Sequence, residues 1–336
     1  MIPKTISDLI SWLRFPLMLG VVLIHSGISG PDNYKVLSYI VKFFTLKLPA
    51  FCVPMFMIIA GYLFFVKVIK FTPPEYFNKL KSRSKSLVVP YLFWNSVVIL
   101  TFWLIHRFIP NLMNPSFENI ANFDFLKLIN CYWSGSGGQP IAFQFWFIRD
   151  LIVFVILSPV FYFLFRKTWI GIALFTVVYL FDLSPWLWSA YFFALGAWLG
   201  IQKIDFIAFS RNIGKYTLIL SVMSLVIMMI GDFSGIRQIY ILSSIITIAA
   251  YGSKLMERVY IPEFLSNSSF FLFCVHALPL LIIEKISTTI LVGKPEWLWI
   301  IDYFFNPLMI IICSTIIYIL FKKSMPKFTS FITGGR

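Results

Sequence analysis

An arginine and a histidine stand eleven residues apart in RFPLMLGVVLIH, where Arg14 and His25 enclose ten mostly apolar residues. Eleven residues of α-helix turn by about 1100° and rise roughly 16 Å, so both side chains lie on one face at different depths. Taken singly, Arg14 can extend to the headgroups and His25 can cap the outer end of the helix. A charge in mid-membrane costs on the order of 3 kcal/mol, so the two residues on one face favour a polar interior cavity.

Two further polar sites interrupt apolar segments. Arg149 and Asp150 are adjacent in FWFIRDLIVF, so they point about 100° apart on a helix and need not pair with each other. Arg149 either extends to the outer headgroups or forms an ion pair with another helix. His276, in FLFCVHALPLLI, is either a hydrogen-bonding residue between helices, the commoner role, or a catalytic one. We rank these three residues as a supporting polar site.

A basic cluster, KLKSRSKS at residues 79–86, stands just before Pro90. One interpretation is a positive-inside anchor for the next membrane span. The other is a docking surface for phosphate groups, to which arginine and lysine donate charge-assisted hydrogen bonds. The two interpretations are compatible. The basic residues are Lys79, Lys81, Arg83 and Lys85.

The elements that must position these residues are membrane spans. Of the 336 residues, 59% are hydrophobic and only 12% charged, with a mean hydropathy of +0.86, whereas soluble domains carry about twice that charge. The first apolar run keeps Arg14 and lacks a small-residue cleavage site, which argues against a removable signal peptide. About ten stretches can cross roughly 30 Å of hydrocarbon. They lie near residues 6–28, 48–66, 87–109, 144–165, 169–182, 186–201, 216–231, 236–251, 268–291 and 298–321.

The positive charges predict how these spans are oriented. With a cytoplasmic N-terminus, most of the 28 Lys and Arg residues fall on the side of the two termini, which is the side that basic residues prefer. We therefore expect an all-α, polytopic transmembrane helical bundle of about ten spans with both termini in the cytoplasm. We expect one membrane domain, residues 1–336, with an irregular external loop at residues 110–143 and no appended soluble domain.

Several kinds of site find no support in the sequence. The four cysteines and three histidines are scattered, and neither CxxC, HExxH, GxxxxGK[ST] nor GxGxxG occurs, so no metal or nucleotide site is expected. The net charge of +14 is mostly a topology signal, because no compact basic domain with interleaved aromatics indicates nucleic acid as a partner.

Five segments in order resemble the acyltransferase 3 family of membrane acyltransferases, and the similarity runs through essentially the whole chain. They are Arg14 with His25, PMFMIIAGYLF (54–64), the basic stretch running into VVPYLFWN (88–95), FWFIRDLIVFVILSPVF (145–161) and SFFLFCVHALPL (269–280). The family's cytoplasmic Arg-x-x-Arg pattern appears here as Arg83 followed by Ser86, with Lys85 adjacent. The basic role is therefore either shared by Lys85 or altered.

The resemblance implies a stand-alone O-acyltransferase with no bound cofactor. It takes an acyl group, most often acetyl from acetyl-CoA, and delivers it to a hydroxyl of a sugar in a surface polysaccharide or lipid-linked glycan. It implies that Arg83 and Lys85 bind the phosphates of the donor and that Arg14 orients it. His25 is the expected catalytic residue, as a general base or through an acyl-histidine. Arg14 or Arg149 would supply hydrogen bonds to the oxyanion.

The resemblance also implies a multi-pass protein of the bacterial inner (plasma) membrane, with acyl-CoA, a glycan acceptor, the lipid bilayer and glycan-assembly proteins as partners. A transporter or flippase for a lipid-linked saccharide is the alternative, since it too needs many spans and polar interior residues. Transporters often show internal repeats, and we find none in the sequence. A noncatalytic membrane sensor is a third class. Both rivals predict that acyl-CoA is not consumed.

Overall fold

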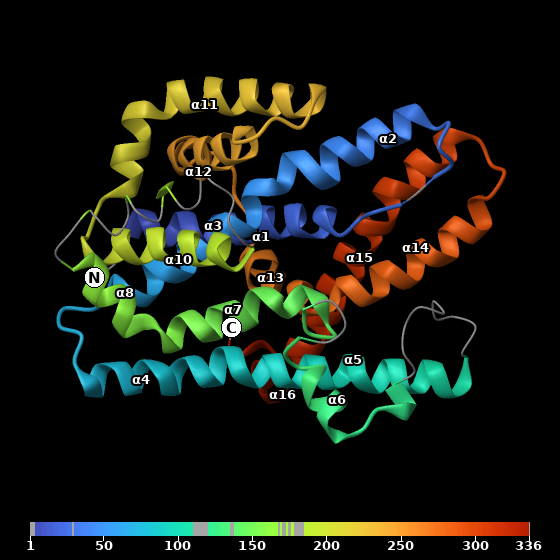
Figure 1. Ribbon diagram of the computed structural model, residues 1–336, viewed down its shortest axis with the longest axis horizontal. Helices are drawn as coiled ribbons and strands as arrows, with labels where there is room; N and C mark the ends of the chain where they lie inside the picture. Colours follow the sequence, from blue (N-terminus) through green and yellow to red (C-terminus); the bar gives the residue numbers. More distant parts are fainter. Residues whose placement is uncertain are drawn as a thin grey trace.

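The computed structural model describes residues 4–28, 30–109, 120–134, 138–166 and 185–335, together with residues 169, 173, 176 and 177. In this part of the chain every regular element is a helix and no strand is present. The helices pack around α1 (Lys4–Ile24), which lies in the middle of the bundle (Figure 1). The predicted all-α fold is therefore confirmed.

Five helical runs are long and apolar enough to cross a membrane. In hydrocarbon every backbone N–H and C=O must be paired inside the protein, and a continuous helix pairs them within one segment. Two of the runs pass through a π-helical turn, and the second of these extends along the lower edge of Figure 1. Besides α1, the runs are α2 (Lys35–Val41) with η1 (Lys42–Lys47), η2 (Leu48–Phe51) and α3 (Cys52–Phe65); α4 (Pro73–Arg83) with η3 (Ser84–Val88) and α5 (Val89–Phe108); α11 (Phe206–Ile230); and α15 (Glu296–Ser324).

Two of the predicted spans are bent helix pairs. The predicted span 144–165 consists of η6 (Phe143–Phe145) and α7 (Trp146–Ile156), followed at an angle of 63° by α8 (Ser158–Phe165). The predicted span 268–291 is α13 (Glu263–Val275) and, at 65°, α14 (Ala277–Leu291). A proline stands in the first turn after each break, where its missing N–H costs no hydrogen bond.

The structure supports several membrane spans, but among the described residues fewer than the predicted number of about ten qualify. Five runs qualify, or up to seven if each bent pair counts as one span. The predicted spans 186–201 and 236–251 coincide with α10 (Pro185–Ile201) and α12 (Ile236–Leu255), of which α10 is apolar but shorter. The predicted span 169–182 lies almost entirely outside the described residues.

Glycines allow α3 and α10 to pack closely. A Cβ atom on Gly61 would overlap the Phe193 carbonyl, and one on Gly196 would overlap the Ile58 carbonyl. Small residues at such positions let helix backbones approach one another, which matters in a bilayer because burial of apolar surface does not drive helices together there. This contact fixes α3, which forms one wall of the cavity described below.

The predicted irregular loop at residues 110–143 is partly helical. It contains η5 (Ile120–Asn122) and α6 (Phe125–Asn130), and the Asp124 carboxylate caps α6 by accepting a hydrogen bond from the backbone N–H of Lys127 at 2.7 Å. An acidic residue at this position is a common helix start. Near the end of the chain, α16 (Pro326–Thr333) packs against α5.

Candidate active site

A cavity of about 490 Å³ lies between α1, α3, α7 and α13. Its walls are mostly apolar and aromatic with a few polar side chains, which is typical of a small-molecule site. Among the described residues, no Asp or Glu lines it. The charged, histidine, amide and hydroxyl side chains in its lining are Arg14, His25, Arg83, Gln144, Ser266, Asn267 and Ser269.

Arg14 and His25 both line this cavity. The helix α1 is continuous from Arg14 to Ile24 and His25 follows it directly, so about 16 Å of helical rise separates the two residues. The guanidinium of Arg14 is half-buried, and it has no hydrogen bond or ion pair with any described residue. A cation withdrawn from water without a counter-charge is costly, so this arrangement favours an anionic ligand.

Arg83 lines the same cavity from the end of α4. It is half-buried, and its guanidinium likewise forms no hydrogen bond or ion pair within the described part of the chain. Guanidinium groups bind phosphate and carboxylate through paired hydrogen bonds. Two of them facing a cavity with no carboxylate among its described lining residues can hold a polyanionic ligand.

The remaining basic residues of the 79–86 cluster lie elsewhere because the cluster is helical and its side chains point in different directions. Lys79 donates a hydrogen bond to the Phe64 carbonyl at 2.9 Å and lies 3.6 Å from the Glu75 carboxylate. Lys81 and Lys85 are exposed and do not line the cavity. Of the two predicted donor-binding residues, the structure therefore brings Arg83 to the cavity and leaves Lys85 outside it.

Three contacts fix the chain immediately after His25. The hydroxyl of Thr45 donates a hydrogen bond to the Ser26 carbonyl at 2.6 Å, and the hydroxyl of Ser26 donates one to the Val22 carbonyl at 3.0 Å. The Glu284 carboxylate accepts a hydrogen bond from the backbone N–H of Gly27 at 3.1 Å. Because Thr45 lies on η1 and Glu284 on α14, two other elements hold the chain at the end of α1, next to His25.

His276 contacts the predicted catalytic residue. The two imidazole rings lie 5.2 Å apart between centroids, and the Phe143 ring packs edge-on against His25 at 5.1 Å. His276 is fully buried at the break between α13 and α14. Its Nδ1 lies 3.1 Å from the Leu272 carbonyl and 2.9 Å from the Phe273 carbonyl. Because carbonyls only accept hydrogen bonds, Nδ1 carries the hydrogen, and Nε2 has a lone pair with no partner among the described residues.

Arg149 and Asp150 pair with each other, although helix geometry alone did not require it. The long arginine side chain folds back, so that its Nη2 lies 3.2 Å from Asp150 Oδ1. Its Nη1 donates hydrogen bonds to the carbonyls of Trp133 and Gly138, both at 2.8 Å. Neither residue lines the cavity. Arg149 thus holds the external loop in place, and this geometry argues against it as an oxyanion donor.

Sequence reasoning missed Gln144, and for Glu284 it suggested only an interfacial position and not the contact with Gly27. The amide of Gln144 is buried, lines the cavity and donates one hydrogen bond, to the Cys274 carbonyl at 3.2 Å. A carboxylate or amide within an apolar run was the available signal, because such groups usually face the protein interior. Within the described residues, no three His, Cys, Asp or Glu side chains gather as a metal ligand set.

Comparisons with known proteins agree with the resemblance. The acyltransferase 3 family, described as an acyltransferase domain, matches residues 8–321. The succinoglycan biosynthesis protein ExoH of Rhizobium meliloti (strain 1021) is 23% identical over 165 residues, which is 46% of this chain and 42% of that protein. The alignment thus spans less than half the length of this relative. No solved structure matches the chain. Since the family match covers nearly the whole sequence and the fold is a bundle of apolar helices, the chain belongs to the acyltransferase 3 family of membrane acyltransferases.

Proposed function

We propose that this protein transfers an acyl group, most often acetyl, from acyl-CoA to a sugar hydroxyl of a surface polysaccharide or lipid-linked glycan. The observation that carries the proposal is a single cavity that holds two arginines without carboxylate partners, Arg14 and Arg83, and the histidine His25. The arginines suit the phosphates of CoA, and the imidazole suits proton transfer near neutral pH.

The donor lies lengthwise in the cavity. Its phosphates bind to the guanidinium groups of Arg83 and Arg14, and its thioester extends toward His25, about 16 Å further along α1. The apolar and aromatic walls, which include Phe56 and Phe147, exclude water from the thioester and limit its hydrolysis. Lys85, exposed and outside the lining, makes no contact with the donor in this arrangement.

His25 acts as the general base. The acceptor hydroxyl gives its proton to the imidazole while its oxygen forms a bond to the thioester carbonyl carbon. The tetrahedral intermediate then collapses, the carbon–sulfur bond breaks, and the CoA sulfur leaves with the proton from the imidazolium. The Gln144 amide, whose Nε2 has a second N–H beyond the one used at Cys274, stabilises the oxyanion. The ring of His276 keeps that of His25 in place.

Two different observations support the proposed acceptor and the proposed orientation of the protein in the membrane. A relative named for succinoglycan biosynthesis supports a polysaccharide or its precursor as the acceptor. The distribution of Lys and Arg along the chain supports cytoplasmic termini. In this proposal about ten spans lie in a bacterial inner membrane, Arg83 faces the cytosolic supply of acyl-CoA, His25 lies toward the outer leaflet, and glycan-assembly proteins deliver the acceptor.

The test is mass spectrometry of surface glycans and lipid-linked precursors from four strains: wild type, gene deletion, His25→Ala and His106→Ala. His106 is the matched control, because it is a half-buried histidine on α5 that does not line the cavity. We expect a mass increase of one acyl group in the wild type and His106→Ala only. Acylation that survives in His25→Ala contradicts the assignment. Loss of whole glycans from the surface with accumulation of unmodified precursors supports the transporter instead.

The same variants distinguish the two catalytic roles of His25. Purified wild-type protein is mixed with isotopically labelled acyl-CoA, quenched within milliseconds and examined by peptide mass spectrometry. The general-base mechanism leaves no label on the protein. A labelled peptide that contains His25, absent from His25→Ala, would show an acyl-histidine intermediate and overturn the general-base assignment.

A further inference from the structure

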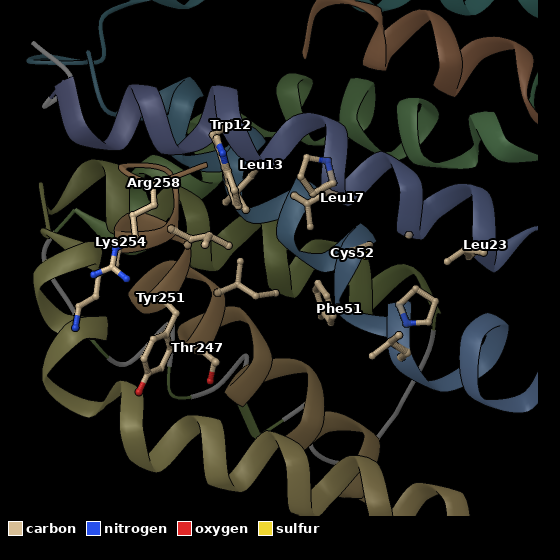
Figure 2. Close-up of a pocket in the computed structure, with 17 residues that line it drawn as sticks. Trp12, Leu13, Leu17, Leu23, Phe51, Cys52, Thr247, Tyr251, Lys254 and Arg258 are labelled. Carbon is tan, nitrogen blue, oxygen red and sulfur yellow. The ribbon is translucent and has the colours of Figure 1, made fainter. Parts of the chain in front are cut away.

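A second and larger cavity, of about 620 Å³, lies on a different face of α1 from the candidate active site. It is a groove between α1, η2 and α12, shown in Figure 2. Its walls are almost entirely apolar, with Leu13, Leu17 and Leu23 along α1 and Phe51 opposite them. Tyr251 and Leu255 in its lining are exposed, so the groove opens to the surface of the bundle, where a membrane protein meets lipid.

The two ends of the groove differ in charge. Figure 2 shows Lys254 and Arg258 together at one end, close to Trp12, and Leu23 at the other. Both basic side chains are exposed, and neither forms an ion pair with a described residue. The nearby Glu257 is engaged elsewhere, 3.9 Å from Arg211. The groove therefore combines an apolar trough with an unneutralised cationic end.

The dimensions of the groove match one leaflet of a bilayer. From Trp12 to Leu23 the lining of α1 rises by about 16 Å, and half of the roughly 30 Å hydrocarbon thickness is about 15 Å. Trp12 lies at the cationic end, where its indole N–H donates a hydrogen bond to the Val259 carbonyl at 2.8 Å. Tryptophan and basic residues gather at headgroup depth, so the cationic end lies where lipid phosphates are.

We infer that this groove binds one anionic phospholipid, with an acyl chain along α1 and its charged headgroup at Lys254 and Arg258. Charge complementarity selects an anionic headgroup over a zwitterionic one, and the apolar trough selects a lipid over a soluble phosphate. The bound chain packs against the helix that carries Arg14 and His25 on another face. The inference does not depend on the proposed acyl transfer.

The experiment measures lipid binding directly, so it is independent of activity. Delipidated full-length protein is titrated in detergent with phosphatidylglycerol or phosphatidylcholine of identical acyl chains, and bound lipid is counted by native mass spectrometry. We expect one tightly bound phosphatidylglycerol and weaker phosphatidylcholine. The double variant Lys254→Ala/Arg258→Ala should weaken phosphatidylglycerol binding about 30-fold, because each basic residue near an anionic headgroup contributes about fivefold. Equal binding of both lipids by the wild type would overturn the proposal.

Two more variants complete the test. Lys322→Ala/Lys323→Ala is the matched control, since these exposed lysines lie at the end of α15, and Lys322 lies over the Tyr318 ring as Lys254 lies over the Tyr251 ring. This control variant should leave tight phosphatidylglycerol binding unchanged. A loss of binding equal to that in Lys254→Ala/Arg258→Ala would show nonspecific charge attraction and contradict the proposal. Ile248 lines the trough, so Ile248→Trp fills it and should remove both the tight phosphatidylglycerol binding and the weaker phosphatidylcholine binding. If the wild type holds no lipid and forms a dimer that Ile248→Trp dissociates, a second copy occupies the groove and the proposal is wrong.

Discussion

Removal of the Glu284 carboxylate tests whether catalysis depends on how the end of α1 is held. Glu284 Oε1 accepts a hydrogen bond from the Gly27 N–H at 3.1 Å, two residues after His25. In Glu284→Ala this exposed N–H loses its acceptor, at a cost of about 0.5–1.5 kcal/mol. The segment that carries His25 then moves more freely. A displacement of about 1 Å in a reacting group can slow a reaction about 100-fold, so we expect kcat to fall roughly 10- to 100-fold.

The assay is release of CoA from acyl-CoA by purified protein in nanodiscs, with a sugar acceptor present and absent. The KM for acyl-CoA should stay within about threefold of the wild-type value, because Arg14 and Arg83 are untouched and the loss is confined to the transition state. Glu284→Gln keeps a carbonyl oxygen at the acceptor position and should recover most of the lost rate.

Glu296→Ala is the matched control for Glu284→Ala. Glu296 Oε1 accepts a hydrogen bond from the backbone N–H of Leu37 at 2.8 Å, so it makes the same type of contact, and neither residue lines the cavity. Its loss should lower the thermal midpoint of the protein and leave kcat unchanged. If the two alanine variants lose kcat equally, or if Glu284→Ala raises KM alone, the positioning argument is refuted.

Two further predictions concern residues that line the cavity. Arg83→Ala should raise the KM for acyl-CoA about 10-fold or more, since a hydrogen bond to a charged group contributes about 1.5–3 kcal/mol, while Lys85→Ala should change it less than about twofold. Initial-rate kinetics measures both KM values. Equal increases in KM for the two variants would indicate that the donor binds at the exposed surface of the helix and not in the cavity. Gln144→Leu should lower kcat about 100-fold with little change in KM, because the oxyanion loses a donor. Single-turnover rates check this, and an effect on KM alone would assign Gln144 to ground-state binding.

The part of the site that was predictable from sequence is the part that lies on one uninterrupted helix. Arg14 and His25 share a cavity because no break falls between them, so the helical repeat alone relates their positions. The basic cluster at residues 79–86 was visible as charge, but sequence could not tell which member faces inward. Arg83 and Lys85 differ by about 200° around a helix, and only packing of this segment against α7 decides which of them reaches the cavity.

The contacts between distant segments were not predictable from sequence. The hydrogen bond from Gly27 to Glu284 joins residues 257 positions apart, and no periodicity encodes such a pairing. Pro279 lies within the predicted span 268–291, but its presence alone does not predict a break, because proline is tolerated inside membrane helices when neighbouring helices supply hydrogen bonds. The 65° bend between α13 and α14 therefore depends on tertiary packing.

That bend accounts for where the second histidine lies. A break in a membrane helix frees backbone groups that hydrocarbon cannot satisfy, so it is tolerated only where buried protein groups pair with them. His276 stands at the break, and its Nδ1–H bonds the Leu272 and Phe273 carbonyls, of which the Leu272 carbonyl already accepts the backbone N–H of His276. The imidazole therefore supplies a hydrogen bond to the Phe273 carbonyl at the break. The same bonds fix its tautomer and leave the Nε2 lone pair beside His25. The helix α1 ends directly before His25, and α13 ends directly before His276. The ends of these two helices therefore meet where the two imidazole rings are in contact.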